Sequence, residues 1–329
     1  RSRAHLRGLR HPPAGLSALG RPASRGTRGA AGPRKGPLPL PKTRPACDTL
    51  TMQQEPAATR RVVFLKLRKT GGTSLASSVL FPYCVRHGLS YMAPVGWWAV
   101  HPRTVPGSHF HMMFRHFPDY PQPWAKKWLK SMIGDYLSLT ILRDPIARAV
   151  SAFNDAVHYN GYRHFQDYWD THHERNHQAR WLGYDGRDDE FLEKNFSMVG
   201  VTERFNECML LFRRVIDLSL EEMLYVPQRR DTPKAVTRAD LSDAWIRKIR
   251  EADWLDFELH AQATRLADYY LEDLPGLDEE LPRYEAALAD LSDPLWAKRG
   301  PFPIGYAPDA VWAEMTADGE VREVGELLA

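Results

Sequence analysis

Three short apolar runs stand out along the chain, at residues 62–65, 137–142 and 198–201. Each holds four to six residues, is dominated by Val, Leu, Ile, Phe or Met, and is bounded by polar residues or glycine. Continuous apolar runs of this length are typical of strands buried on both faces of a parallel sheet. We therefore predict three buried parallel strands.

A loop and a helical pattern follow each of these runs. The expected helices cover residues 74–80, 146–157 and 203–215, with Pro145 in the first turn of the second and Thr202 capping the third. Repeated strand–loop–helix units predict an α/β fold, in which helices flank a parallel sheet in a P-loop-like arrangement.

The rest of the chain divides less regularly. Residues 1–60 are rich in Arg, Pro, Gly, Ala and Ser, which predicts a basic disordered stem, a linker or a targeting remnant; a basic arm for membranes or polyanions is the alternative. A loop is expected at 227–240 and one helix at 242–272. We expect the main domain to span 61–272, and 273–329 to form an irregular, Pro-rich acidic extension.

Charge is spread unevenly over the 329 residues, although the net value is only +3. Residues 1–45 hold 11 Lys or Arg, and the first acidic residue is Asp48, which leaves 33 basic against 41 acidic residues in the remainder. A general nucleic-acid binder would show the opposite balance, so we expect no nucleic-acid partner, and any anionic ligand must meet local basic clusters.

Three other features bear on the compartment. The cysteines Cys47, Cys84 and Cys208 form no disulfide framework and allow at most one bridge, whose existence stays open. Asn195 begins a triplet that fits N-glycosylation. No apolar run approaches the ~18 residues of a membrane span, and the start at Arg instead of Met is compatible with an anchor upstream.

The clearest chemical motif follows the first predicted strand. It joins a cation, two glycines and three hydroxyls at the start of a helix, where backbone N–H groups and the helix dipole favour an anion. Its residues are Lys69, Thr70, Gly71, Gly72, Thr73 and Ser74. The Lys precedes the glycines, unlike in a Walker A loop. The motif predicts a phosphate cradle, with a simple capped helix start as the alternative.

The second strand–loop–helix unit offers a second anion site. Arg143 ends the second predicted strand, and Ser151 lies on the helix that follows. Ligands of open α/β sheets bind at the carboxyl ends of the strands, where an Arg fork and a hydroxyl could hold a second phosphate. Alternatively, Arg143 pairs with Asp144 and Ser151 is a small packing residue.

Residues 64–74 resemble the 5′-phosphosulfate loop of Golgi-type carbohydrate sulfotransferases, in the branch of the galactose 3-O- and uronyl 2-O-sulfotransferases. Residues 141–151 resemble the 3′-phosphate segment of that family, with Arg143 and Ser151 at matching spacing, and the likeness extends over about 61–272. Many relatives have Pro or His before the loop lysine, where this chain has Arg68.

The resemblance implies 3′-phosphoadenylyl sulfate (PAPS) as co-substrate, no metal, a carbohydrate acceptor and a lumenal catalytic domain in the Golgi membrane. Lys69 and its loop would hold the 5′-phosphosulfate, Arg143 and Ser151 the 3′-phosphate, and the basic loop 229–234 would close over the nucleotide. The acidic body favours a neutral sugar such as galactose. The alternatives are a nucleotide-dependent phosphoryl transferase and a non-catalytic glycan- or nucleotide-binding protein on the same fold.

A sugar hydroxyl must lose its proton during transfer, and histidine titrates in the suitable range. His109 and His111 share one face of an extended segment, and similarity to the His-x-His element of the uronyl 2-O branch implies that His111 is the general base, with His109 in support. His116 is expected to be structural.

Residues 173–177 also match the H-E-x-x-H pattern of zinc hydrolases. Their flanks are polar and no third ligand is evident downstream, so we interpret this segment as a solvated helix or loop, with a zinc site as the alternative.

Overall fold

The computed structural model describes residues 60–87, 89, 91–92, 111–115, 120, 122–225 and 235–291. Within these residues, five strands form one sheet in the order β2-β3-β1-β4-β5, and all four pairings are parallel. The strands are β1 (Val62–Leu65), β2 (Tyr91–Met92), β3 (Met112–Arg115), β4 (Leu137–Leu142) and β5 (Met198–Val201). The predicted parallel α/β fold is confirmed, and β1, β4 and β5 have the predicted bounds.

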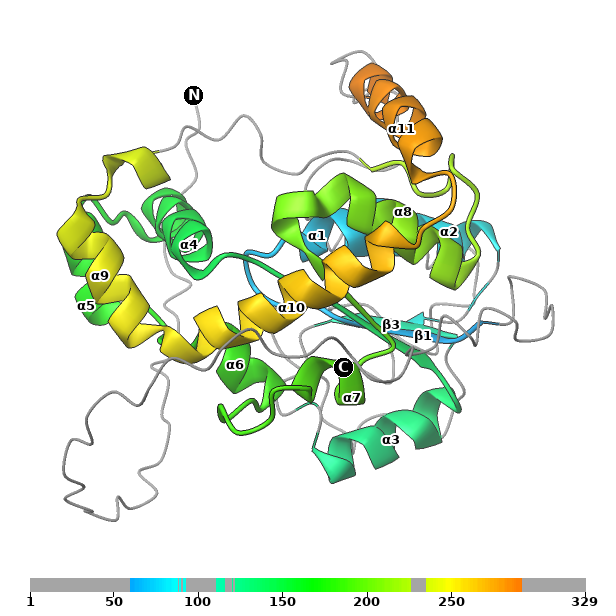
Figure 1. Ribbon diagram of the computed structural model, residues 1–329, viewed down its shortest axis with the longest axis horizontal. Coiled ribbons are helices and arrows are strands. Elements are labelled where there is room, and N and C mark those ends of the chain that lie inside the picture. The colour runs from blue at the N-terminus through cyan, green and yellow to red at the C-terminus, as the bar shows by residue number, and fades with distance from the viewer. Residues whose placement is uncertain are drawn as a thin grey trace, which may run out of the picture. The chain divides into compact units, whose positions relative to one another are not determined.

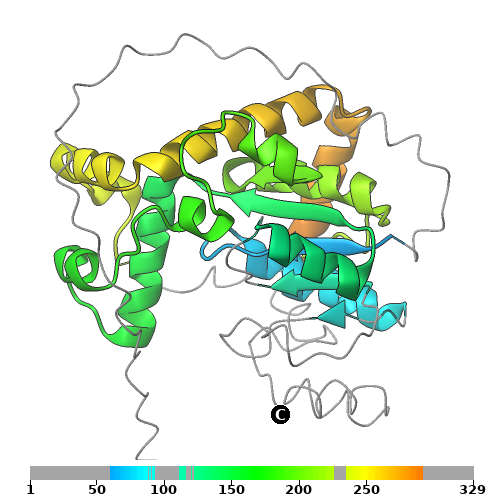
Figure 2. The same ribbon diagram turned by 90° about the horizontal axis from the view of Figure 1, so that it is seen from below.

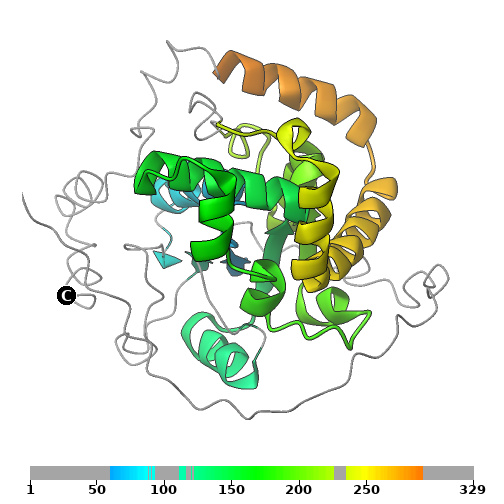
Figure 3. The same cartoon turned by 90° about the vertical axis from the view of Figure 1, so that its left-hand side faces the viewer.

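The sheet is buried because its strands are apolar on both faces. Every residue of β1 and β5 is buried, as is all of β4 except Leu137. In Figure 1, α1 (Gly72–Leu75), α2 (Phe81–Arg86) and α8 (Phe205–Ile216) lie on one side of the sheet, and α3 (Pro123–Ile133) lies on the other. Figure 3 shows α3 on the same side when the molecule is turned.

The helices after β1 and β4 begin at Gly72 and Pro145, within two residues of the predicted starts. A π-helical turn at Ala76–Leu80 joins α1 to α2, and α4 spans Pro145–Asn160. The remaining helices are α5 (Phe165–Thr171), α6 (His177–Leu182), α7 (Phe191–Asn195), α9 (Asp243–Ala252), α10 (Trp254–Glu272) and α11 (Leu277–Leu291). Helices α4, α5 and α9 share a second apolar cluster that includes Phe153, Phe165 and Ile249. Figure 2 shows α10 running along one side of the sheet.

Three predictions about local structure are wrong. The expected helix 242–272 is two helices, which meet at the fully buried Asp253. Residues 277–291 form α11 instead of irregular chain, and the buried Tyr284 on it donates a hydrogen bond to the Met223 carbonyl. Thr202 does not cap α8; its hydroxyl donates to the carbonyls of Thr70 and Leu142 instead.

The structure places two of the three cysteines, the predicted glycosylation residue and the helices that were considered for a membrane span. Cys84 and Cys208 are free and buried, and burial raises the pKa of each thiol to about 12, whereas Cys47 lies outside the described residues. The Asn195 amide donates to the Phe191 carbonyl and accepts from Lys126. None of the described helices combines the length and apolar character that crossing a membrane requires.

Helices α6 and α10 cap each other. The Asn176 side chain, just before α6, accepts hydrogen bonds from the first-turn amides of α10 at Leu255 (2.9 Å) and Asp256 (3.3 Å). The Asp256 carboxylate in return accepts from the amides of Gln178 (3.2 Å) and Ala179 (2.8 Å) in α6. Each helix thus satisfies N–H groups that its partner leaves open. This exchange fixes the start of α6, which holds Gln178.

We predict that Asn176→Gly destabilises the protein by about 1–2 kcal/mol, because two part-buried amides of α10 lose their acceptor. Asn176 has φ +48°, a conformation that glycine tolerates, so the substitution tests the side chain and not the backbone. Asp217→Gly is the matched control: Asp217 has φ +67° and ends α8. Urea unfolding should separate the two variants, and equal free energies of unfolding would contradict the capping role.

Candidate functional site

The loop after β1 packs too tightly for side chains at its two glycines. Gly71 has φ +80°, and a Cβ there would lie 2.8 Å from the ring of Phe205. At Gly72 a Cβ would lie 2.9 Å from Cγ of Lys66. Lys69 itself has φ +66°, which L-residues seldom adopt. The loop is therefore a tight, preformed turn against the start of a helical run, as an anion cradle requires.

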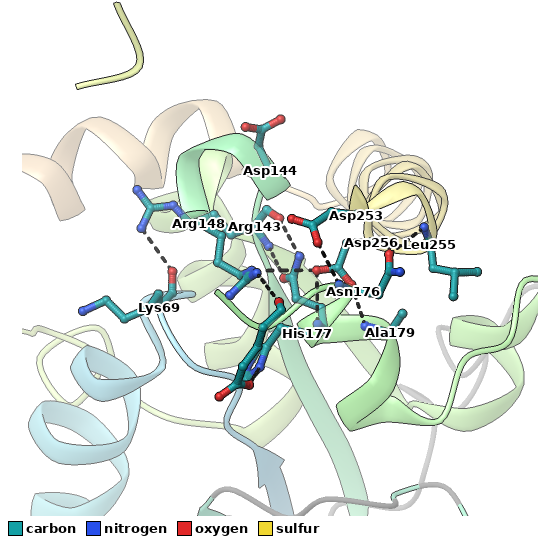
Figure 4. A network of polar contacts seen from close by, with 12 residues as sticks. Lys69, Arg143, Asp144, Arg148, Asn176, His177, Ala179, Asp253, Leu255 and Asp256 are labelled. Atoms are coloured by element: carbon teal, nitrogen blue, oxygen red, sulfur yellow. Dashed lines mark hydrogen bonds and ion pairs between the residues drawn. The ribbon is translucent and has the colours of Figure 1, made fainter. Parts of the chain in front are cut away.

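Arg143 joins this loop to the second strand–loop–helix unit. Its Nη1 donates to the Lys69 carbonyl at 3.1 Å, as Figure 4 shows. The Gln178 side chain holds the Arg143 backbone at both its N–H and its carbonyl, each at 2.9 Å. Burial lowers the pKa of the Arg143 guanidinium, but the normal value is so high that the group stays charged. The predicted pair of Lys69 loop and Arg143 is thus brought together.

Helix α4 supplies the other residues beside the loop. Asp144 caps its start by accepting from the Ala147 amide at 2.8 Å, and Ser151 follows on the helix, half-buried. One turn beyond Ser151, the Asp155 carboxylate meets Nζ of Lys69 at 2.9 Å. Asp155 was not predicted as a site residue from the sequence, although its spacing of four from Ser151 places both residues on one helix face.

A pocket opens between this loop, α4 and α5. Each cation in its wall has an acidic neighbour: Arg68 pairs with Glu174 (3.1 Å), Lys69 pairs with Asp155 (2.9 Å), and Arg148 lies 3.8 Å from Asp256. The lining residues are Arg68, Lys69, Arg148, Ala152, Asp155, Ala156, Asn160, Tyr168, His172, Glu174 and His177. The pocket is polar, and each of its three cations lies near an acidic group.

The H-E-x-x-H segment forms a loop and the first residue of α6, and its histidines are buried instead of solvated. His173 meets Asp253 at 3.0 Å, and Nδ1 of His177 meets Glu174 at 2.5 Å. Burial lowers the pKa of His177 to about 4, and the hydrogen bond from His177 lowers the pKa of Glu174 to about 2. A neutral imidazole therefore donates to a carboxylate. In the described part of the chain, no cluster of three or more His, Cys, Asp or Glu is arranged to hold a metal ion.

The structure does not bring His111 to the loop. The Val62 amide, at the start of β1, donates to the His111 carbonyl, and Met112 pairs with Val62. His111 thus lies at the amino edge of the sheet, about 13 Å, the length of four strand residues, from the edge where the loop begins. Its pKa is lowered by burial and by nearby Arg61. His109, His116 and the basic loop 229–234 lie outside the described residues.

Comparisons with known proteins agree with the parallel α/β fold. A family model described as the sulfotransferase family matches residues 57–260. Galactose-3-O-sulfotransferase 2 of Sus scrofa is 27% identical over 229 residues. That alignment covers 56% of this chain and 56% of the relative, so the chain spans about half the length of the protein it resembles.

We predict that Gly71→Ala lowers the free energy of unfolding by more than Gly161→Ala does. Both residues have positive φ, +80° and +72°, so each alanine carries a left-handed strain of about 1–2 kcal/mol. Only at Gly71 does the new Cβ also meet an aromatic ring; at Gly161 nothing lies within 4 Å. The overpacking should add about 1–3 kcal/mol in denaturant titrations. Equal losses would show that the loop can relax away from Phe205.

Proposed function

The chain belongs to the sulfotransferase family, and we propose that it moves a sulfuryl group from PAPS to a hydroxyl of a carbohydrate. The observation that carries this proposal is the hydrogen bond from Arg143 to the Lys69 carbonyl. It holds two loops with anion-binding chemistry side by side at the carboxyl edge of the sheet, where α/β proteins bind nucleotides.

The residues present suit a donor with two separate phosphate groups. The loop from Lys69 to Ser74 offers an ammonium group, hydroxyls and the first amides of a helical run to the 5′-phosphosulfate. Arg143 and Ser151 offer a guanidinium and a hydroxyl to the 3′-phosphate. Arg143 donates one of its five guanidinium N–H groups to the Lys69 carbonyl, and the other N–H groups can donate to a phosphate.

Lys69 would promote the reaction by stabilising the leaving group. The acceptor oxygen forms a bond to sulfur while the bond from sulfur to the 5′-phosphate oxygen breaks, and negative charge collects on that phosphate. An ammonium group at the bridging oxygen stabilises this charge more in the transition state than in the ground state, which is the condition for catalysis. The backbone of Lys69 has a positive φ and its carbonyl accepts a hydrogen bond from Arg143. These two features define the backbone position from which the Lys69 side chain extends.

The acceptor we infer is a neutral saccharide such as one ending in galactose. The pocket beside Lys69 supports this, because each of its cations lies near an acidic group and a long polyanion would call for unpaired cations. The name of the porcine relative, a galactose-3-O-sulfotransferase, points the same way. We also infer a lumenal position in the Golgi membrane from the family resemblance.

The proposal is tested by transfer of labelled sulfate from PAPS to galactose-ended glycolipid, galactose-ended glycoprotein and a uronic-acid polymer. We expect the galactose acceptors to be labelled and Lys69→Ala to lower the rate about 10²–10³-fold. PAP, the donor product, should also bind more weakly to that variant in calorimetry. Labelling of no acceptor by wild-type protein that binds PAP would refute the transferase assignment.

His111→Ala should keep turnover within about threefold of wild type, because His111 lies at the edge of the sheet opposite the donor loop. The expectation from sequence was the reverse. Initial rates at saturating donor and acceptor decide the matter, with Lys69→Ala as the inactive reference. A loss of 100-fold or more in His111→Ala, with an unchanged melting temperature, would restore His111 as the base.

A further inference from the structure

Asp155 lies next to the lysine that the proposed reaction depends on. Its Oδ1 is 2.9 Å from Nζ of Lys69, and both side chains line the same pocket. The side chains are 15% and 20% exposed, so solvent and a ligand can reach them although most of their surface is covered. The carboxylate stands on α4, a 16-residue helix, one turn beyond Ser151.

The donor and Asp155 compete for one ammonium group. The backbone of Lys69 is fixed by its positive φ and by Arg143, so the side chain can turn between partners without movement of the loop. A phosphosulfate bound in the loop would draw Nζ away from Asp155. The carboxylate would then line the pocket without its cation and could accept a hydrogen bond from an acceptor hydroxyl.

From this geometry we propose that Asp155 accepts the proton of the acceptor hydroxyl; the inference rests on the sulfuryl transfer proposed above. The hydroxyl proton passes to the Asp155 carboxylate as the hydroxyl oxygen bonds to sulfur. The electron pair of the broken sulfur–oxygen bond stays on the 5′-phosphate, beside Lys69. Asp155 then returns the proton to water. One ion pair thus keeps both catalytic groups in place until the donor separates them.

The other acidic groups near the pocket have structural tasks. Glu174, the second acidic residue in the lining, is shared by Arg68 and His177 and forms part of the wall. Asp253 and Asp256 are fully buried and hold the amides of α6. His111 lies at the far edge of the sheet. Asp155 combines exposure, a rigid helix and contact with Lys69.

The test separates donor binding from turnover in Asp155→Asn, which keeps the shape of the side chain. We expect turnover to fall about 100-fold or more. PAP should bind at least as tightly as to wild type in calorimetry, because Lys69 loses the competing carboxylate. Asp170→Asn is the matched control: Asp170 makes a surface pair with Lys248 at 3.8 Å and does not line the pocket, so its turnover should stay within twofold.

A second variant distinguishes the loss of a proton acceptor from a disturbance of the structure. Asp155→Ala should regain at least tenfold in turnover when sodium formate supplies a carboxylate, and sodium chloride at equal ionic strength should not restore it. Three results would each overturn the proposal: turnover in Asp155→Asn within threefold of wild type, PAP affinity that falls in step with turnover, or no rescue by formate. If wild-type protein binds PAP but labels no sugar, the transferase proposal is refuted, and the role of Asp155, which rests on it, is refuted as well.

Discussion

The hydrogen bond from Arg143 to the Lys69 carbonyl is the contact on which the rest of the site depends. It joins the loop after β1 to the loop after β4, two segments 74 residues apart in the chain. The Thr202 hydroxyl reinforces the junction by donating to the carbonyls of Thr70 and Leu142. Parallel pairing of β1 with β4 brings the loops to one edge of the sheet, and these side chains then fix their spacing.

A buried polar network supports the spacing of these two loops. Gln178 holds the Arg143 backbone, Asp256 holds the amide of Gln178, and Asn176 caps the helix that carries Asp256. Burying so many polar groups is costly unless each finds a partner. Mutual capping of α6 and α10 supplies such partners to the amides at both helix starts. The H-E-x-x-H segment is part of this support, since His173 pairs with Asp253 and His177 with Glu174.

Sequence patterns predicted the elements whose burial is uniform. The apolar runs of β1, β4 and β5 leave no alternative to a buried strand, and Lys69 and Arg143 follow directly from the ends of two of them. The position of His111 could not be predicted, because the spacing of two histidines does not say at which end of a strand they lie. That depends on where β3 begins, which the register with β1 decides.

Other misjudged features arise from tertiary contacts. Asp253 interrupts the long C-terminal helix pattern because its carboxylate is recruited by His173 and by the amide of Asn176. Residues 277–291 form a helix because Leu277, Tyr284 and Leu288 find a buried surface to pack on. The contact between Asp155 and Lys69 joins residues 86 positions apart, and only the helix spacing from Ser151 hinted at it. The domain boundaries at 60 and 272 stay predictions.

We propose that the Lys69 loop and Arg143 form one clamp, which holds the two phosphate groups of a single nucleotide. Calorimetry with PAP and 5′-AMP tests this most directly, since the two nucleotides differ by the 3′-phosphate alone. A charge-assisted contact from Arg143 should make PAP bind more tightly by about 1.5–3 kcal/mol, and Ser151→Ala should narrow that gap. Equal affinities for the two nucleotides in the wild-type protein would contradict the clamp.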